Sequence, residues 1–169
     1  TYNPSEFYKV EDASQFNNGP VMIPYEAGSV FKTFTVAVGI DKGVITPSST
    51  YYNTDSIKIE DRVISNALKG MTGKVSMQTA LNYSLNTGMV TIAERLGGST
   101  GTITRSARDT IYGYYHDRLG LGGLTGIEVT GESAGRIISP REQEGNAVRY
   151  SNMVFGQGLD VTMIQVAAG

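Results

Sequence analysis

The chain has 169 residues with interspersed acids and bases and a formal net charge of −2, which favours one domain and excludes the basic stripe of a nucleic-acid binder. It contains no cysteine and one histidine, His116, which excludes disulfides, cysteine nucleophiles, thiolate metal sites and multi-histidine metal sites. No stretch reaches the roughly 18 apolar residues of a membrane span and no signal peptide is apparent, so we expect any membrane anchor to lie outside these residues.

The first part of the chain predicts a loop-like start and then one buried helix. Residues 1–24 are polar and contain Asn-Pro, Asn-Gly and Ile-Pro pairs, which predict a short strand followed by a loop. After Ala27-Gly28-Ser29, the run over residues 30–40 carries apolar groups on nearly every side. Its length and pattern predict a buried central helix.

The middle of the chain predicts short strands followed by helices. Residues 43–66 are rich in Thr, Ser, Tyr and Ile between turn residues, which predicts short strands or a hairpin. Ser76 is placed to cap a helix that ends near residues 84–88, and a second helix covers residues 89–96. Residues 101–118 carry apolar side chains at helical spacing and predict a third helix.

The last part of the chain predicts a long loop and one more helix. Residues 120–140 are glycine-rich and predict a loop with a short strand at residues 127–129. A final helix is expected after Asp160, whose carboxylate would cap it.

Ser29 and Lys32 form the first candidate for chemistry. Residues three apart on a helix lie on the same face, so the hydroxyl and the amine can meet. Ser29 is expected at a helix N-terminus, where free N–H groups favour a developing anion. Lys32 follows Phe31 and precedes Phe34. Desolvation among such side chains lowers the pKa of a lysine, so that it can act as the base that a serine nucleophile needs. A capping serine with an incidental lysine remains the alternative from this pair alone.

Ser84 and Asn86 form the second candidate, on a predicted turn between two helices. A hydroxyl and an amide in this place can relay a proton and hold a substrate amide, although Ser-x-Asn is also ordinary turn chemistry. A Ser-x-x-Lys sequence followed by a Ser-x-Asn triplet occurs in penicillin-binding proteins and β-lactamases. We therefore expect Ser29, Lys32, Ser84 and Asn86 to converge. The Ser29 and Lys32 side chains should lie within about 3–4 Å, and the Ser84 hydroxyl should lie about as close to Lys32.

The flanking residues resemble one family over essentially the whole chain. Residues 24–35 resemble the nucleophile segment of class B penicillin-binding proteins, in which proline usually stands in place of Ala27. Residues 83–89, Tyr-Ser-Leu-Asn-Thr-Gly-Met, resemble the second motif of that family. Residues 125–132 and 155–162 match two further landmarks in the same order.

The resemblance implies a mixed α/β, penicillin-binding/β-lactamase-like transpeptidase fold, with a helical lobe near residues 67–120 against part of an antiparallel sheet. It implies a serine transpeptidase that cross-links peptidoglycan stem peptides ending in D-Ala-D-Ala and that β-lactams acylate. Ser29 would attack and Lys32 would take its proton. Ser84 would pass a proton to the leaving amine, and Asn86 would position Lys32 and the substrate amide.

The resemblance also sets expectations about surroundings. The family works at the extracytoplasmic face of the bacterial cell membrane, with other cell-wall synthesis proteins as partners. Neither a cofactor nor a metal is expected, and no nucleic acid is expected as a partner.

One family motif is absent. No Lys-Thr-Gly triplet occurs in the 169 residues, whereas the family carries one on a strand some tens of residues after the Phe-Gly-Gln-Gly segment. We therefore expect residues 1–169 to be a partial transpeptidase domain. That strand supplies one donor of the oxyanion hole, and the loss of such a donor costs roughly a hundredfold to a thousandfold in rate. The chain alone is accordingly expected to acylate slowly, with an open sheet edge that another chain could fill.

Two other functions stay open from the sequence. A serine β-lactamase or a β-lactam sensor would use the same nucleophile, and the β-lactamase would need a carboxylate such as Glu128 or Glu132 to activate water. An inactive scaffold or interaction fragment is the non-enzymatic alternative.

Overall fold

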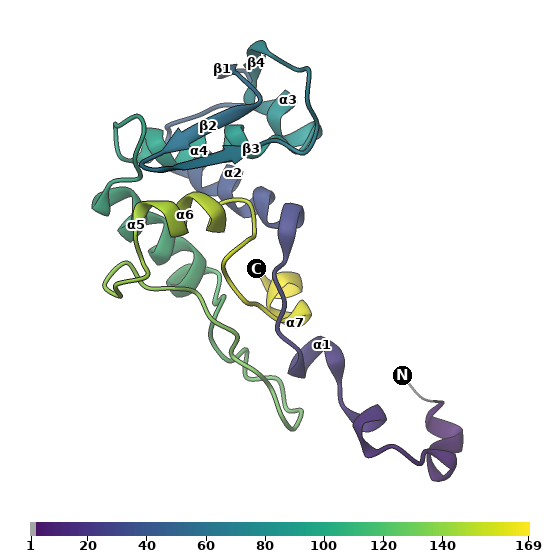
Figure 1. Cartoon of the computed structure of the whole chain (residues 1–169). Helices are drawn as coiled ribbons and strands as arrows, with labels where there is room; N and C mark the ends of the chain where they lie inside the picture. The colour runs from purple at the N-terminus through teal and green to yellow at the C-terminus, as the bar shows by residue number, and fades with distance from the viewer. Residues whose placement is uncertain (1–2) are drawn as a thin grey trace.

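The computed structural model describes residues 3–169, and Figure 1 shows helices clustered beside short strands. The fold is therefore mixed, as the sequence predicts. The α-helices are α1 (Gly19–Met22), α2 (Lys32–Asp41), α3 (Met77–Asn82), α4 (Asn86–Leu96), α5 (Arg105–Tyr112), α6 (Ala147–Met153) and α7 (Met163–Ala168). The other helical turns are η1 (Pro4–Lys9), η2 (Ala13–Phe16), η3 (Gly28–Phe31) and the π-helical η4 (Gly113–Arg118).

The strands form two separate antiparallel pairs. Strand β1 (Thr50–Asn53) pairs with β4 (Gly73–Ser76), and β2 (Ser56–Ile59) pairs with β3 (Arg62–Ser65) in a hairpin. Glu60 in the hairpin turn has φ of 53°, a left-handed conformation that a tight turn requires. The strands and the hairpin expected within residues 43–66 are thus confirmed.

Helix α2 lies at the centre and packs on α3 and α4 (Figure 1). Gly39 permits the close approach, because a Cβ there would lie 2.8 Å from side-chain carbons of Ile45 and Ile92. Thr35 Oγ1 donates to the carbonyl of Val154, which joins α2 to the end of α6. The helix buries one side only, and Ile40 remains 48% exposed. The helix is central as predicted, but the expected burial is wrong for the face that carries Thr33, Ala37 and Ile40.

The start of the chain differs from its prediction. Residues 3–22 form short helical turns, and no strand occurs there in the described residues. Asn3 and Asp12 explain this, since each side chain accepts a hydrogen bond from the backbone N–H two residues ahead and so caps a turn. Tyr25 alone makes a β-bridge, to Val161.

The C-terminal third holds two further corrections. The loop over residues 120–140 is confirmed, but residues 127–129 form no strand. Helix α6 was not predicted from the sequence; Asn146 caps it by accepting from the N–H of Arg149. The last helix is capped by Thr162 in a capping box with Gln165, because Asp160 is held in a β-bridge to Arg136.

None of the helices described over residues 3–169 is long and apolar enough to cross a membrane.

A buried polar cluster fixes the start of α4. Asn66 Oδ1 accepts from the backbone N–H of Thr87, and Asn53 Oδ1 accepts from Asn66 Nδ2 and from Thr87 Oγ1. Leu85, at the N-cap position of α4, offers no capping side chain. Asn66 therefore caps this helix from outside and ties the residue after β3 to the Ser84–Asn86 turn.

Replacing Asn66 by alanine should lower the free energy of unfolding by about 1–3 kcal/mol. The change removes the acceptor for a buried backbone N–H and leaves that group without a partner. Chemical denaturation measures the loss. Asn17→Ala, at an exposed position, is the control and should change the free energy by less than about 0.5 kcal/mol. Equal effects of the two changes would show that the cluster does not hold α4.

Candidate active site

The segment around Ser29 is fixed by the Phe155–Gly158 segment. Gly28 adopts φ of 62° and donates its N–H to the carbonyl of Gly156 at 2.9 Å. Gly156 itself has no room for a side chain, because a Cβ there would lie 2.1 Å from the Gly28 carbonyl oxygen. Glu26 Oε1 accepts from the N–H of Gly158 at 2.7 Å. Two distant parts of the sequence thus hold η3 and its serine in place.

Ser29 and Lys32 lie in opposite environments although one turn separates them. Ser29 is exposed in η3, whereas Lys32, the first residue of α2, is 1% exposed. The sequence prediction that a helix begins at this pair is confirmed. The nucleophile candidate is therefore accessible to a substrate, and the base candidate is shielded from water.

Ser84 sits on a sharp turn between α3 and α4. Its φ of 56° is unusual for a residue other than glycine. The turn is held by hydrogen bonds from the N–H of Ser84 to the Leu81 carbonyl and from the N–H of Leu85 to the Ala80 carbonyl. Left-handed backbone of this kind often persists at functional sites, where the surrounding structure enforces it. The turn directs both the hydroxyl and the carbonyl of Ser84 at Lys32.

A chain of hydrogen bonds joins the three side chains. Lys32 Nζ donates to Ser84 Oγ at 2.7 Å and to the Ser84 carbonyl at 2.6 Å. Ser84 Oγ in turn donates to Ser29 Oγ at 2.9 Å. Over residues 3–169 the structure contains no direct hydrogen bond between Ser29 and Lys32. The expected convergence is present, but Ser84 links the pair that was expected to meet directly.

Burial changes the basicity of Lys32. Desolvation lowers the pKa of its ammonium from 10.5 to about 8. The two hydrogen bonds to Ser84 go to neutral oxygens, so no carboxylate among these partners stabilises the charge. A lysine with such a pKa is partly neutral near pH 7 to 8, and a neutral amine can accept the proton of a hydroxyl.

Asn86 has a different contact from the one expected. Its Nδ2 donates to the carbonyl of Ser65 at 2.9 Å and makes no hydrogen bond to Lys32. It therefore joins the start of α4 to the end of β3. The amide still lines the same cavity as Ser29 and Lys32, so it remains available to a bound molecule.

The cavity at these residues has a volume of about 250 Å³. Ala67, Leu68, Phe155 and Gln157 also line it, as does Tyr83, which is 54% exposed. Sequence reasoning did not single out Ala67 and Leu68, because nothing in a small or apolar residue of a loop indicates a site. Only the position of the loop after β3 brings them here.

His116 lies outside this cavity. Its ring stacks on Tyr112 with centroids 4.9 Å apart, and Nδ1 is 2.9 Å from a carboxylate oxygen of Asp117. Within residues 3–169 no three His, Cys, Asp or Glu side chains are grouped so that they could hold a metal ion.

The lowered pKa of Lys32 should make stability depend on pH. The folded chain has the lower pKa, so the unfolded chain binds more protons between pH 8 and 10.5, and the free energy of unfolding should rise across that window. Each unit of pKa difference corresponds to about 1.4 kcal/mol. The rise is measured as the difference between wild type and Lys32→Met by denaturation at several pH values. Lys58→Met, at an exposed position, is the control and should follow wild type. A constant difference for Lys32→Met would contradict the effect of burial.

Comparison with known proteins places these features in a family. The family model of the penicillin binding protein transpeptidase domain matches residues 1–169. Stage V sporulation protein D of Bacillus subtilis is 29% identical over 168 residues, which cover 99% of this chain and 24% of that protein. The peptidoglycan D,D-transpeptidase FtsI homolog of Mesostigma viride is 27% identical over 176 residues, which cover 99% of this chain and 27% of the homolog.

A solved structure supports the same family. Penicillin Binding Protein 2X from Streptococcus thermophilus superposes with a TM-score of 0.70 at 26% identity, covering 89% of this chain and 20% of that one. The chain thus spans about a quarter of the length of the curated relatives it matches. The match over every residue, the order of the motifs and the shared fold lead to one conclusion: the chain belongs to the penicillin-binding protein transpeptidase family, and its resemblance to the class B members is confirmed.

Proposed function

We propose that this chain carries the acylating residues of a serine D,D-transpeptidase, with Ser29 as the nucleophile. The observation that supports this is the hydrogen-bonded chain from Lys32 through Ser84 to Ser29, in which a buried amine of lowered pKa is linked to an exposed hydroxyl. A relative of similar sequence is named a peptidoglycan D,D-transpeptidase homolog. Residues 1–169 would form part of the transpeptidase domain.

Acylation begins with neutral Lys32. As Ser29 Oγ attacks the carbonyl between the two terminal D-alanines, its proton passes to Ser84 Oγ while the Ser84 proton passes to Lys32 Nζ. A C–O bond forms and a tetrahedral oxyanion results. The C–N bond then breaks, and the leaving amine takes a proton from Ser84, which Lys32 replaces. The products are an ester on Ser29, a free D-alanine and neutral Lys32.

Transfer reverses the proton path. The amine of a neighbouring stem peptide attacks the ester and loses a proton along Ser84 to Lys32. Ser29 Oγ leaves and regains a proton by the same route, which leaves an amide cross-link. The N–H of Ser29 is one donor for the oxyanion, because the first N–H groups of a helix have no acceptor within it.

The substrates and surroundings follow from the same proposal. Stem peptides ending in D-Ala-D-Ala would be the substrates, and β-lactams would acylate the same serine. The reaction would take place at the extracytoplasmic face of the bacterial membrane, beside other cell-wall synthesis proteins.

The β-lactamase alternative is weaker. The residues that line the cavity include no carboxylate that could activate water for deacylation. Glu132 is instead bound to the N–H and hydroxyl of Thr125 at 2.6 and 2.5 Å, in the loop before α6. A stable acyl-enzyme is what such a site should give.

Ser29→Ala should abolish covalent labelling by a fluorescent penicillin. The change removes the only atom that can form the ester while it leaves the backbone of η3 intact. Labelling is measured by in-gel fluorescence and by the mass of the intact protein. Ser106→Ala, an exposed serine on α5, is the matched control and should label like wild type. Labelling that survives in Ser29→Ala would place the nucleophile elsewhere.

The labelling rate should depend on the protonation of Lys32. We expect the second-order rate constant to rise with pH and to level off above about 8, as the amine becomes neutral. Lys32→Ala should retain almost no labelling at any pH. The rate constant is measured in stopped-flow or quench experiments from pH 6 to 9.5. A rate that falls across this range would rule out Lys32 as the base.

A further inference from the structure

The cavity at Ser29 continues into a second one. Ala67, Asn86, Phe155 and Gln157 line both the cavity of about 250 Å³ that contains Ser29 and a neighbouring cavity of about 310 Å³. The shared lining residues place the two cavities next to each other. The second cavity extends along β3, away from Ser29.

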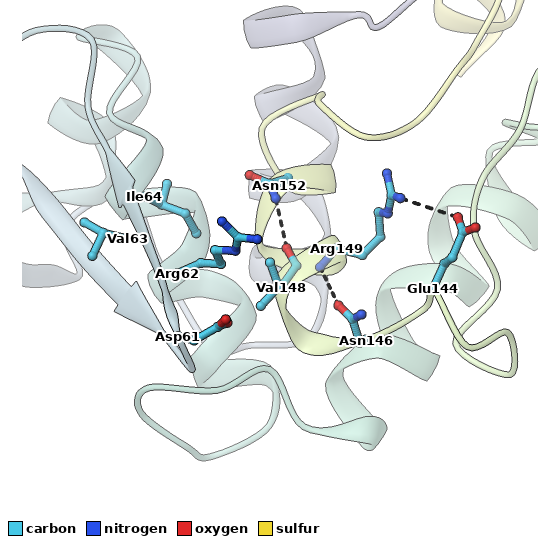
Figure 2. A pocket seen from close by; sticks show the side chains of 9 residues that line it. All are labelled: Asp61, Arg62, Val63, Ile64, Glu144, Asn146, Val148, Arg149 and Asn152. Carbon is cyan, nitrogen blue, oxygen red and sulfur yellow. Dashed lines mark hydrogen bonds and ion pairs between the residues drawn. The ribbon is translucent and has the colours of Figure 1, made fainter.

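A third and larger space follows. Val63, Ile64 and Asn152 line both the second cavity and a third of about 570 Å³, which Figure 2 shows between β3 and α6. We call the second and third cavities together the β3–α6 groove, with residues 61–67 on one wall and residues 144–157 on the other. The groove runs from the candidate active site to the turn of the β2–β3 hairpin.

Arg62 is the unpaired cation of this groove. Its side chain extends from β3 toward Val148 and Asn152 of α6 (Figure 2) and has no hydrogen bond or ion pair within residues 3–169. The second arginine, Arg149, is already engaged, with Glu144 at 3.4 Å and the Gly158 carbonyl at 3.4 Å. Asp61, the other charged residue here, lies at the hairpin turn and forms no ion pair with Arg62. A guanidinium with five free donors is suited to hold a carboxylate.

We propose that the β3–α6 groove binds an extended part of the substrate peptide and that Arg62 holds a carboxylate on it. This inference rests on the proposed function, because it extends the binding site of the same Ser29. Amide groups lie along the path: the Gln157 side chain has no hydrogen-bond partner in the described residues, and Asn86 Oδ1 is likewise unused. Such groups can pair with the backbone of a bound peptide.

The length of the groove sets which residue of a bound peptide lies beside Arg62. An extended chain rises about 3.3 Å per residue and β3 ends at Ser65, so the wall from Arg62 to Ala67 spans at most roughly 17 Å. A peptide whose scissile bond is at Ser29 therefore brings a residue about three to five positions before that bond next to Arg62. The groove thus selects for an acidic residue at this distance.

Two synthetic hexapeptides test the proposal. Both end in D-Ala-D-Ala and carry a fluorophore at the N-terminus, and they differ only by glutamate or glutamine at the second position. Binding to the 169-residue chain is measured by fluorescence anisotropy. We expect the wild-type chain to bind the glutamate peptide more tightly and Arg62→Gln to lose this preference, with about a tenfold rise in Kd for the glutamate peptide. Arg62→Glu should favour a third peptide with lysine at that position.

Arg141→Gln is the matched control, because it removes one exposed arginine outside the groove and should keep the glutamate preference. A wild-type chain that binds both peptides equally, or neither, overturns the proposal, as does an unchanged preference in Arg62→Gln. Penicillin labelling of Ser29 separates this failure from failure of the proposed function. Penicillin labelling without a glutamate preference refutes only the proposed role of the groove. A glutamate preference that depends on Arg62, without penicillin labelling, refutes only the proposed acylation of Ser29.

Discussion

The burial of the Lys32 amine is the constraint on which the site depends. An ammonium without a nearby counter-charge is costly to remove from water, and here two short hydrogen bonds to Ser84 offset part of that cost. The same burial lowers the pKa of the amine and so makes it a usable base. Burial therefore destabilises the charged lysine, while the hydrogen bonds to Ser84 link it to Ser29, the candidate nucleophile. Any shift of the Ser84 turn would change both effects together.

The rest of the structure serves to hold that turn and the serine opposite it. Asn53 and Asn66 form the buried cluster that caps α4, so the β-strands help to position Ser84 from behind. On the other side, the backbone of Gly156 lies so close to Gly28 that there is no room for a side chain at Gly156. The candidate nucleophile Ser29 and its hydrogen-bond partner Ser84 thus come from separate segments, each supported by a distant part of the chain.

The cavity at Ser29 adjoins the β3–α6 groove. Asn86 and Phe155 line both the cavity at Ser29 and the start of this groove, and charged, polar and apolar side chains together line the groove between the β2–β3 hairpin and α6. Within residues 3–169 the Arg62 side chain at the end of the groove has no hydrogen bond or ion pair, and this is the observation from which we infer recognition of a carboxylate.

The sequence by itself determined the family, the four candidate residues, the helix at Ser29 and the hairpin, because motif order and local periodicity depend only on neighbouring residues. It did not determine the role of Ser84 as a link between Ser29 and Lys32, or the bond of Asn86 to Ser65, since these contacts join residues up to 55 positions apart. It also missed α6, and it misplaced the cap of α7 because the bridge between Asp160 and Arg136 is long-range. Only the tertiary packing decided which side chains meet and how completely Lys32 is shielded from water. It also decided that a groove lies between the cavity at Ser29 and Arg62.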